Sequence, residues 1–313
     1  MPTTSALRVT DRSGTLHVSE LDLPVPGPRE VLVDLSYAGV NPVDQYTAKG
    51  LVSPDGPLPR TLGGEASGRL DDRPVLVTGA GLGASRDGVW SRHAVVPREA
   101  VLALPAGVDP RQAAAAGVAG LTAWSTVVEL AQVTAADRVL VLGASGGVGL
   151  TLISLATSLG AEVWGQVRSD NKEPALHAAG AAGAVVADAA SLRDAASDLR
   201  PTVVIDALGG DFVPPALALL TPGGRYVVFG TSAGSDVRLD WQAVYRNNLQ
   251  VLGYGGIVLS GDERRRRLRQ VLLALADGRM SIPVARTVPL ADGTQVFDRP
   301  TAAGPGKTLL DLG

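Results

Sequence analysis

Hydrophobic residues follow two different patterns along this chain. Between about Leu121 and Tyr254, short apolar runs without polar alternation are separated by segments of helix length. Such runs are typical of parallel strands that are buried on both faces. The six runs cover residues 138–142, 161–167, 182–189, 202–208, 224–230 and 249–255. Strands that alternate with helices in this way predict an α/β fold with a doubly wound parallel sheet.

The rest of the chain is predicted to be rich in β-structure. Up to about residue 120, short runs of Val and Leu are interrupted by Pro and Gly, which indicates strands joined by turns. An Ala-rich stretch, residues 111–131, has helical propensity and is expected to lead into the second domain. After Gly255 we expect a helix over residues 261–278 and strands over 285–290 and 306–312. The run from Arg264 to Arg267 is interpreted as a solvated helix face rather than an anion or nucleic-acid site.

The first apolar run of the α/β region leads into a glycine-rich turn. Residues 138–142 stop at Gly143, and Gly146, Gly147 and Gly149 precede a helix predicted over residues 148–159. Glycines let the backbone approach a pyrophosphate closely, and the helix N-terminus presents free amides and a positive dipole end. Ala144 occupies the first position of the usual three-glycine pattern, but the strand, turn, helix and second strand follow in the required order. We therefore predict a dinucleotide site that includes Ser145, Gly146, Gly147 and Val148.

The end of the second strand indicates which dinucleotide is bound. Gln166, Arg168, Ser169 and Lys172 can all donate hydrogen bonds, and no carboxylate precedes Asp170. A cofactor with a free 2′-hydroxyl usually meets an acidic side chain here, whereas donors suit a 2′-phosphate. This favours NADPH over NADH. The alternative is that Arg168 and Lys172 are ordinary solvated loop residues.

Composition narrows the classes of partner. The chain has 313 residues, 28 basic and 31 acidic, with a net charge of −3, so no general attraction to nucleic acid or anionic lipid is expected. It contains no cysteine, which excludes disulfides, thiolate nucleophiles and the softest metal ligands. His17, His93 and His177 show no metal-like spacing, so no metal site is predicted. Since no signal peptide or membrane-length apolar run is present, we expect a soluble cytoplasmic protein.

Several motifs together resemble one enzyme family, the zinc-independent quinone oxidoreductases of the medium-chain dehydrogenase/reductase superfamily. They are AGVNPVDQYTAKG (residues 38–50), PRTLGGEASG (59–68), AAAAGVAGLTAW (113–124), GASGGVG (143–149), VVIDALGG (203–210), TPGGRYVVFG (221–230) and GKTLLDL (306–312). The resemblance implies a GroES-like catalytic domain, residues 1–120 completed by 256–313, and a Rossmann domain over 121–255. It also implies NADPH as cofactor and a homodimer joined through the edge of the Rossmann sheet.

The same resemblance separates this chain from zinc alcohol dehydrogenases. Those enzymes carry an early Cys, a His-Glu pair after a Gly and a structural lobe of four Cys, whereas here Gly64 stands at the His position. Without a Lewis acid, reduction of a quinone or a conjugated C=C is the easier reaction, because a carbonyl already makes the receiving carbon electrophilic.

Three residues of the first motif are candidates for catalysis by resemblance. Asn41, Asp44 and Tyr46 face the nicotinamide in similar proteins. Tyr46 is expected to donate a hydrogen bond or proton to the substrate carbonyl, and Asn41 to orient cofactor or substrate. The alternative is a turn that starts a helix, with Pro42 in the first position and Asp44 in the first turn.

Further cofactor contacts are expected at strand ends. Phe229, Gly230 and Thr231 end one predicted strand, and Asp206, Ala207 and Leu208 end the preceding one, at the carboxyl edge where open sheets bind cofactors. Thr122 resembles the family threonine near the nicotinamide; the alternative is a buried hydroxyl bonded to its own helix. Lys307 matches the family's Gly-Lys pair and is expected either to reach the cofactor phosphates or to be a surface lysine.

The predicted function is an NADPH-dependent, metal-independent reductase of quinones or α,β-unsaturated carbonyl compounds. One alternative is an enoyl-thioester reductase of fatty-acid or polyketide metabolism, since residues 78–97 resemble acrylyl-CoA reductase relatives. Another is a redox sensor that binds NADPH without turnover. The substrate stays open, because the segment after Gly68 is shorter than usual in the family and no motif constrains the loops at residues 51–60 and 257–261.

Overall fold

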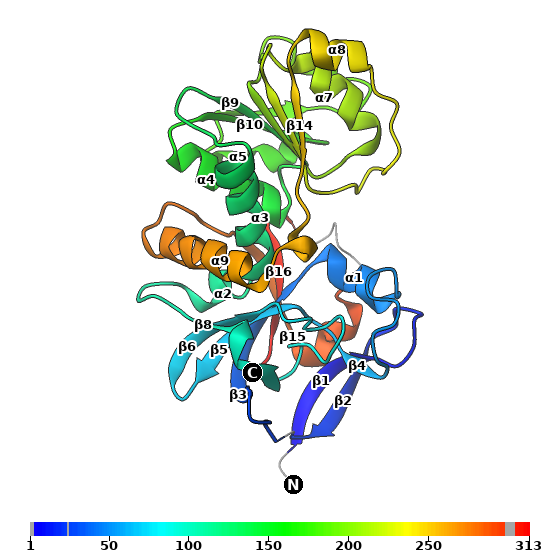
Figure 1. The fold of residues 1–313 in the computed structure, drawn as a ribbon, viewed down its shortest axis with the longest axis vertical. Coiled ribbons are helices and arrows are strands. Elements are labelled where there is room, and N and C mark those ends of the chain that lie inside the picture. Colours follow the sequence, from blue (N-terminus) through cyan, green and yellow to red (C-terminus); the bar gives the residue numbers. More distant parts are fainter. Residues whose placement is uncertain (1–2, 24, 298–303) are drawn as a thin grey trace. The chain divides into compact units, whose positions relative to one another are not determined.

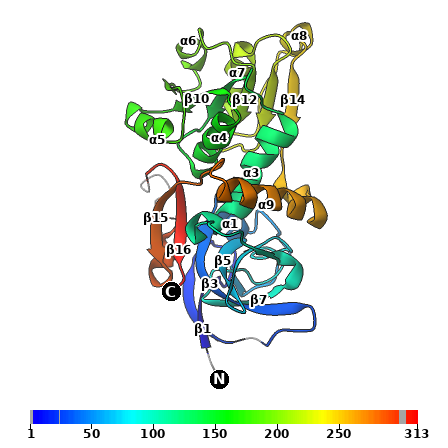
Figure 2. The ribbon, with the colours of Figure 1, turned by 90° about the vertical axis from the view of Figure 1, so that its left-hand side faces the viewer.

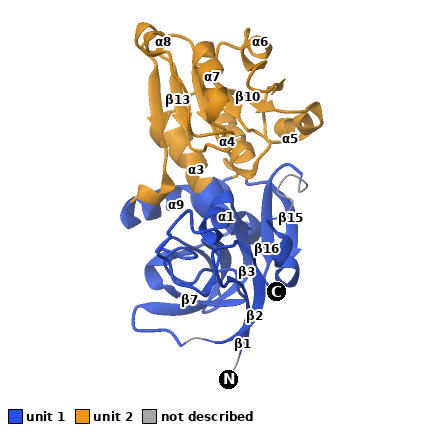
Figure 3. Cartoon of the chain, turned by 90° about the vertical axis from the view of Figure 1, so that its right-hand side faces the viewer, with its two compact units in different colours: residues 1–119, 260–277, 282–313 blue, residues 120–259, 278–281 orange. Residues whose placement is uncertain are grey.

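The computed structural model describes residues 3–23, 25–297 and 304–313. The chain forms two compact units, coloured separately in Figure 3. Unit 1 comprises residues 1–119, 260–277 and 282–313, and unit 2 comprises residues 120–259 and 278–281. Within the described residues, no helix combines the length and apolar character needed to cross a membrane.

Unit 2 contains a six-stranded sheet in which all neighbouring strands are parallel. The spatial order is β11-β10-β9-β12-β13-β14, which is the Rossmann order and confirms the predicted fold class. Its strands are β9 (Arg138–Leu142), β10 (Glu162–Val167), β11 (Gly183–Val186), β12 (Val203–Asp206), β13 (Arg225–Val228) and β14 (Gln250–Gly253). All six match the predicted apolar runs.

Helices of unit 2 cover both faces of this sheet. Because parallel crossovers are right-handed, the helices that follow β9 and β10 lie on one face and those that follow β12 and β13 on the other, as Figure 1 shows for α4 and α7. The direction of strand order reverses between β9 and β12, where open α/β sheets bind ligands. The helices are α3 (Leu121–Trp124), α4 (Gly147–Ser158), α5 (Glu173–Ala178), α6 (Leu192–Ala195), α7 (Val213–Leu219) and α8 (Trp241–Arg246).

Strand residues supply much of the core of unit 2. Leu140, Leu142 and Val204 are fully buried and pack with Phe212 and Tyr226 in one hydrophobic cluster. Continuous apolar strands suit this position because helices cover the sheet on both sides.

Unit 1 is built mainly of antiparallel strands and confirms the predicted β-rich region (Figures 1 and 2). Its larger sheet has the order β15-β16-β3-β5-β6-β8, with β7 also paired to β3, and its smaller sheet has the order β2-β1-β4. The strands are β1 (Thr3–Val9), β2 (His17–Asp22), β3 (Glu30–Val40), β4 (Arg60–Thr61), β5 (Glu65–Leu70), β6 (Arg73–Thr78), β7 (His93–Pro97), β8 (Val101–Ala103), β15 (Val284–Pro289) and β16 (Lys307–Asp311). Its helices are α1 (Pro42–Ala48), α2 (Pro110–Ala113) and α9 (Gly261–Ala276).

Strand β3 is the longest strand and organises unit 1. Val31, Val33 and Leu35 alternate with partly exposed residues and enter the core. A bulge between Leu35 and Tyr37 then shifts the register against β5, after which Ala38 and Gly39 are buried. A bulge changes which side chains of a strand face the core. This bulge therefore determines which residues at the end of β3 are buried. Strand β5, which pairs with β3, contains no run of Val and Leu, so the apolar pattern did not indicate it.

The Ala-rich stretch is helical, as predicted, but not a single α-helix. After α2, turns of π-type over Ala116–Gly120 and Ser125–Leu130 flank α3. Such wide turns are uncommon and often occur at functional sites.

Candidate active site: a nucleotide edge in unit 2

The glycine-rich turn lies between β9 and α4. Gly143 has φ +71°, the left-handed region that glycine adopts without strain. The Ala144 N–H donates to the Gln166 carbonyl at 3.0 Å, which ties the turn to the end of β10. A Cβ on Gly149 would lie 2.5 Å from the Ala144 carbonyl oxygen, so the helix can approach the turn this closely only with glycine there. Ala144 itself is fully buried, and its φ is not in the left-handed region, so the position does not require glycine.

The start of α4 offers unpaired backbone donors. Within the described chain, the N–H groups of Ser145, Gly147 and Val148 have no hydrogen-bond acceptor, and the residues 145–148 are at least partly exposed. Gly146 precedes the helix and supplies no side-chain cap. Free amides at the positive end of a helix are the groups that bind a pyrophosphate. The predicted residues therefore form a turn that suits the anion.

Gln166 does not play its predicted part. Its side chain is buried, and its Nε2 donates to the Ala187 carbonyl at 2.6 Å while its Oε1 accepts from the Gly143 N–H at 3.1 Å. The prediction that it donates to a 2′-phosphate is wrong, because the amide is already used to hold the turn. Gln166 lies between the buried residues Gly165 and Val167, in a sheet whose two faces are both covered by helices.

The cations after β10 remain available. Arg168 is exposed and Lys172 is partly exposed, and neither side chain has a hydrogen bond or ion pair within the residues that the structure describes. Ser169 donates its hydroxyl hydrogen to Asn171 Oδ1 at 2.6 Å. This arrangement leaves two positive side chains beside the loop that follows β10, as a 2′-phosphate site requires.

Asp206, the last residue of β12, holds the turn that follows this strand. Its carboxylate is buried and accepts from the Leu208 N–H at 2.6 Å, the Gly209 N–H at 3.1 Å and the Tyr226 hydroxyl. Burial raises the pKa of Asp206, and these hydrogen bonds oppose that rise. Asp206 thus fixes the turn at Ala207 and Leu208, which stay partly exposed, and the predicted cofactor contact at this strand end stays a prediction.

The end of β13 lies against the end of β12. The Phe229 N–H donates to the Asp206 carbonyl at 2.9 Å, and a Cβ on Gly230 would lie 2.7 Å from the Ala207 carbonyl. Phe229 and Gly230 are partly exposed, and Thr231 is exposed. These residues reach the carboxyl edge of the sheet, as predicted from the strand.

Thr122 is buried on α3. The alternative prediction, that its hydroxyl bonds to its own helix, is wrong. The Thr122 side chain makes no hydrogen bond within the described residues, and it is Thr126 Oγ1 that donates back to the Thr122 carbonyl at 2.8 Å. Its predicted contact with the cofactor stays a prediction.

Candidate active site: a buried polar cluster in unit 1

Unit 1 buries a charged cluster that consists of Asn41, Glu65 and Lys307. Asn41 Nδ2 donates to Glu65 Oε1 at 2.7 Å, and the Lys307 ammonium donates to Asn41 Oδ1 and to the Val40 carbonyl at 3.0 Å. Lys307 Nζ lies 3.6 Å from Glu65 Oε1, and all three residues are at most 5% exposed. Their mutual pairing offsets the cost of removing two charges from water.

The topology explains why residues far apart in sequence meet here. Strands β16, β3 and β5 are adjacent and antiparallel, so Lys307 and Glu65, which begin β16 and β5, lie beside Asn41, which follows β3. Small residues leave room for the carboxylate: a Cβ on Gly39 would overlap Glu65 Oε1. The Val118 N–H donates to Glu65 Oε2 at 2.8 Å and completes its hydrogen bonds.

The role of Glu65 was not predicted from the sequence. Glu65 lies in the motif GGEASG, in which only the preceding residue, Gly64, was interpreted. A buried carboxylate needs positively charged or hydrogen-bonding partners. In the sequence, the Gly-Lys pair at residues 306–307 was the one indication of such a partner for Glu65. Lys307 is buried, so its interpretation as a surface lysine is wrong. Its contact with cofactor phosphates stays a prediction, since its ammonium faces three oxygens of unit 1.

Asp44 confirms the interpretation of NPVD as a helix start. Pro42 is the first residue of α1, and Asp44 Oδ2 accepts from the Asn41 N–H at 2.8 Å. Burial raises the pKa of Asp44 from its ordinary value of 3.8 to about 7; nearby Glu65 adds to the rise, whereas the bond from Asn41 and the charge of Lys307 oppose it. Asp44 therefore changes its charge near neutral pH.

Tyr46 differs from its neighbours in exposure. Its side chain on α1 is 45% exposed and makes no hydrogen bond within the described chain. A free phenol at this position can donate to a substrate oxygen, whereas the Asn41 amide is held at both ends and is better suited to a fixed orientation.

The side chains of this chain do not fit a zinc site. In the described residues, no group of three His, Asp or Glu side chains could hold a metal ion, and the whole sequence has no cysteine. Gly64, beside Glu65, stands where the resemblance to zinc alcohol dehydrogenases implies a histidine ligand, and glycine has no side chain to bind a metal.

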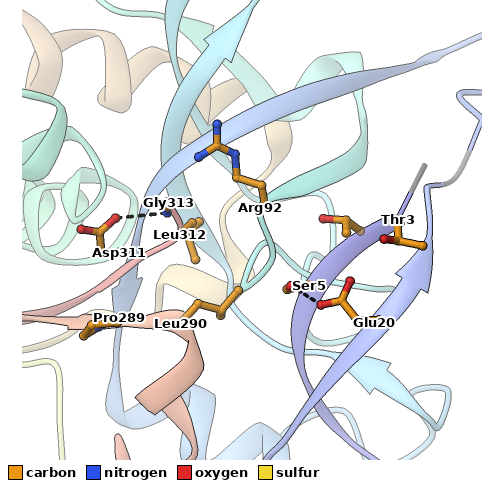
Figure 4. Close-up of a pocket in the computed structure, with 10 residues that line it drawn as sticks. Thr3, Ser5, Glu20, Arg92, Pro289, Leu290, Asp311, Leu312 and Gly313 are labelled. Carbon is orange, nitrogen blue, oxygen red and sulfur yellow. Dashed lines mark hydrogen bonds between the residues drawn. The ribbon is translucent and has the colours of Figure 1, made fainter.

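A polar pocket of about 620 Å³ in unit 1 lies at another place (Figure 4). Thr3, Ser5, Glu20 and Arg92 contribute to its walls, and Ser5 donates its hydroxyl hydrogen to Glu20. None of the predicted site residues lines it.

Comparisons with known proteins show which family this chain belongs to. The family described as zinc-binding dehydrogenase matches residues 147–276. Quinone oxidoreductase-like protein 2 of Mus musculus is 31% identical over 254 residues, which cover 78% of this chain and 73% of the mouse protein. The chain belongs to the medium-chain dehydrogenase/reductase superfamily. This confirms the superfamily that the sequence motifs indicated.

Other known proteins are similar over nearly the whole chain. A mycocerosic acid synthase-like polyketide synthase of Mycolicibacterium smegmatis is 28% identical over 92% of this chain, which spans only 14% of that synthase. A crystal structure of an NAD-dependent alcohol dehydrogenase is 26% identical, with a TM-score of 0.88 over 99% of this chain and 100% of that chain. A mycobacterial protein complexed with NADPH is 25% identical, with a TM-score of 0.85 over 98% of this chain and 99% of that chain.

Proposed function

We propose that this protein is an NADPH-dependent reductase that transfers hydride to a quinone or an α,β-unsaturated carbonyl compound without a metal. The observation that carries the proposal is the pairing of an anion-binding turn at Gly146 with the free cations Arg168 and Lys172 in unit 2. Unit 2 is then the nucleotide-binding domain, predicted as residues 121–255, and unit 1 the catalytic domain, predicted as residues 1–120 and 256–313.

NADPH supplies the hydride when it is bound, and this chain's residues do the rest. Ser145, Gly147 and Val148 provide amides for the pyrophosphate, and Arg168 and Lys172 provide charge for the 2′-phosphate. Ala207, Leu208 and the segment Phe229–Thr231 form the sheet edge for the ribose and nicotinamide side. The similarity to a protein complexed with NADPH supports this cofactor, although an NAD-dependent relative is equally similar in fold.

Chemistry on the substrate needs a donor at the oxygen where negative charge develops. In the proposed reaction, Tyr46 donates its phenolic proton or a hydrogen bond to the carbonyl oxygen while hydride reaches the conjugated carbon or quinone. Asn41, held by Glu65 and Lys307, has a fixed orientation, which favours a positioning role beside the cofactor. Asp44 holds the start of α1, the helix that presents Tyr46.

A second candidate is an enoyl-thioester reductase of fatty-acid or polyketide metabolism. It is favoured by the similarity of nearly the whole chain to a segment of polyketide synthases. The chemistry is closely related, because a thioester carbonyl activates the conjugated C=C in the same way and Tyr46 serves the same oxygen. The two candidates differ in the group attached to the reacting carbonyl, which is a thioester in the second candidate, and share the hydride transfer.

One assay separates these candidates. The purified protein is incubated with NADPH and, in turn, a benzoquinone, a 2-alkenal and crotonyl-CoA, and oxidation of NADPH is followed. Turnover of quinone or alkenal supports the first candidate, and a clear preference for crotonyl-CoA supports the second. Tight NADPH binding without oxidation of any acceptor would instead indicate the redox sensor. Absence of binding to any nicotinamide dinucleotide would contradict all three.

We also propose that the protein is a homodimer joined at β14, the outer strand of the six-stranded sheet. Val251 on this strand is exposed, as are nearby Trp241, Tyr245, Ile257 and Val258. An open strand edge with apolar neighbours can pair with a second copy. The predicted cytoplasmic location stays a prediction.

A further inference from the structure

Four arginines from separate segments of unit 1 line an open depression of about 840 Å³. Arg29 precedes β3, Arg86 lies between β6 and β7, Arg98 begins the short helical turn after β7, and Arg265 belongs to α9. Only Arg265 comes from the arginine run of the sequence. Convergence of this kind is created by the fold, since β3 and β7 are paired and bring Arg29 next to Arg98.

The guanidinium groups of this arginine depression are only partly used by the protein. The side chains of Arg29 and Arg98 are exposed and make no hydrogen bond or ion pair within residues 3–23, 25–297 and 304–313. Backbone pairing of the Arg98 N–H with the Arg29 carbonyl at 3.0 Å keeps the two residues together. Arg265 is held in place, because its guanidinium donates to the carbonyls of Glu99 and Val101.

The two carboxylates at the depression do not neutralise it. Glu30 accepts from the Gly27 N–H at 3.2 Å and lies 3.9 Å from Arg86, so its charge is already shared with protein groups. Glu99 is the other acidic lining residue. Four arginines against two glutamates leave a positive concave surface, which concentrates anions.

We propose that this depression binds a small molecule that carries a phosphate or diphosphate group. Guanidinium groups bind phosphate oxygens through paired N–H donors, and two unpaired ones side by side can hold one group between them. The volume is within the range of small-molecule sites, and a concave surface suits such a ligand better than a flat protein partner.

The proposed anion site is separate from the polar cluster of unit 1. Arg29 precedes the first residue of β3 and Asn41 follows the last, and 11 residues separate them along an extended strand. From Arg29 to Asn41 there are 12 residue steps (41 − 29), which at about 3.3 Å each correspond to about 40 Å. A ligand at the arginine depression therefore acts as an effector or stabiliser of unit 1, not as the reacting substrate.

Calorimetric titration with pyrophosphate tests the proposal on the full chain. To weaken binding at the nucleotide edge, whose glycine turn is itself proposed to receive a pyrophosphate, the titrations are made in the G149A/R168S/K172S background. Adding R29S/R98S is expected to raise the Kd for pyrophosphate at least tenfold. The matched control adds R73S/R238S, which removes two exposed arginines whose side chains also lack partners among the described residues, and should change the Kd less than twofold. Equal weakening by both pairs would overturn the site.

A second measurement covers the case in which a variant folds poorly. Crystals of the unaltered protein soaked in pyrophosphate should show it bonded to Arg29 and Arg98, and its absence there would contradict the proposal. Tighter binding of hexaglutamate than of pyrophosphate, lost in R29S/R98S, would instead assign the surface to an acidic protein segment.

Discussion

Asn41 lies where three strands of unit 1 begin or end, and both ends of its amide are held by buried charges. The residues that surround it hold the site rigid, whereas the exposed Tyr46 is left free to act. The same division occurs in unit 2, where buried Gln166 and Asp206 hold the turns and the side chains of Arg168 and Lys172 remain unpaired among the described residues.

The charge of Lys172 should decide between cofactors. Lys172→Ala is expected to weaken NADPH binding by about 1 to 3 kcal/mol, the value of a lost charge-assisted hydrogen bond, and to leave NADH binding unchanged. Fluorescence titration with both nucleotides measures this. Arg193→Ala, an exposed cation elsewhere in unit 2, is the control and should affect neither. Equal losses for the two nucleotides would remove Lys172 from the 2′-phosphate site.

Glu65 and Lys307 should depend on each other for stability. Glu65→Gln or Lys307→Met alone leaves a buried charge unpaired and is expected to lower the free energy of unfolding by about 3 to 5 kcal/mol. The double variant should lose less than the sum, with a coupling of about 1 to 3 kcal/mol in urea denaturation. Glu162→Gln, which breaks the exposed pair with Arg138, is the control and should cost below about 1 kcal/mol. Additive losses would mean that the pair is not formed.

Asp44 should make stability depend on pH. Its pKa is raised from 3.8 to about 7, so the folded state keeps a proton that the unfolded chain has already lost between these values. The free energy of unfolding of the native protein therefore falls as pH rises from about 4 to 7. The side chain of Asp44→Asn cannot titrate. The free energy of unfolding of this variant, relative to that of the native protein, should therefore increase by about 2 to 4 kcal/mol between pH 4 and pH 7. Parallel pH curves for the two proteins would contradict the buried, protonated carboxyl.

At the scale of elements, the connection from β9 to α4 shows how closely a turn can match a sequence pattern. Helix α4 begins one residue before its predicted start and ends one before its predicted end. Strand β3 behaves differently, because its bulge between Leu35 and Tyr37 has no signature in the apolar pattern, yet it sets the face on which the strand's last residues lie.

Gly149 tests the close approach of α4 to the turn. Gly149→Ala would place a Cβ 2.5 Å from a backbone oxygen, which only a shift of the helix start can relieve. We expect a loss of about 1 to 3 kcal/mol in stability and clearly weaker binding of NADPH. Gly261→Ala at the start of α9 is the control, because a Cβ there meets nothing within 4 Å. Unchanged nucleotide affinity in Gly149→Ala would show that the turn does not receive the pyrophosphate.

At the scale of the molecule, the strand order of unit 2 leaves β11 and β14 as the two outer strands of the sheet. Both carry an exposed valine, Val186 on β11 at 46% and Val251 on β14 at 40%. The exposure of one valine on each strand therefore does not show which edge forms the dimer. The exposed aromatic residues Trp241 and Tyr245, which are close to β14 in sequence, favour the β14 edge.

A positive charge placed on the β14 edge should dissociate the proposed homodimer. Val251→Lys is expected to convert the proposed homodimer to a monomer, because a strand edge that carries Lys is a poor template for pairing. Light scattering after size-exclusion chromatography measures the mass. Val186→Lys adds the same charge to the other edge and should leave the dimer intact. A monomeric native protein, or a dimer that survives Val251→Lys, would contradict the proposed interface.

The sequence by itself determined the architecture of this protein, because buried parallel strands must be apolar throughout and a phosphate-binding turn must contain glycine. It also determined which side chains carry charge beside that turn. Only the tertiary structure decided the use of each polar side chain. Gln166 is buried because helices cover both faces of its sheet, and Asp206 took backbone amides as partners. Glu65 met Lys307 because β5 and β16 lie on either side of β3, a contact across 242 positions (307 − 65) that no local pattern specifies.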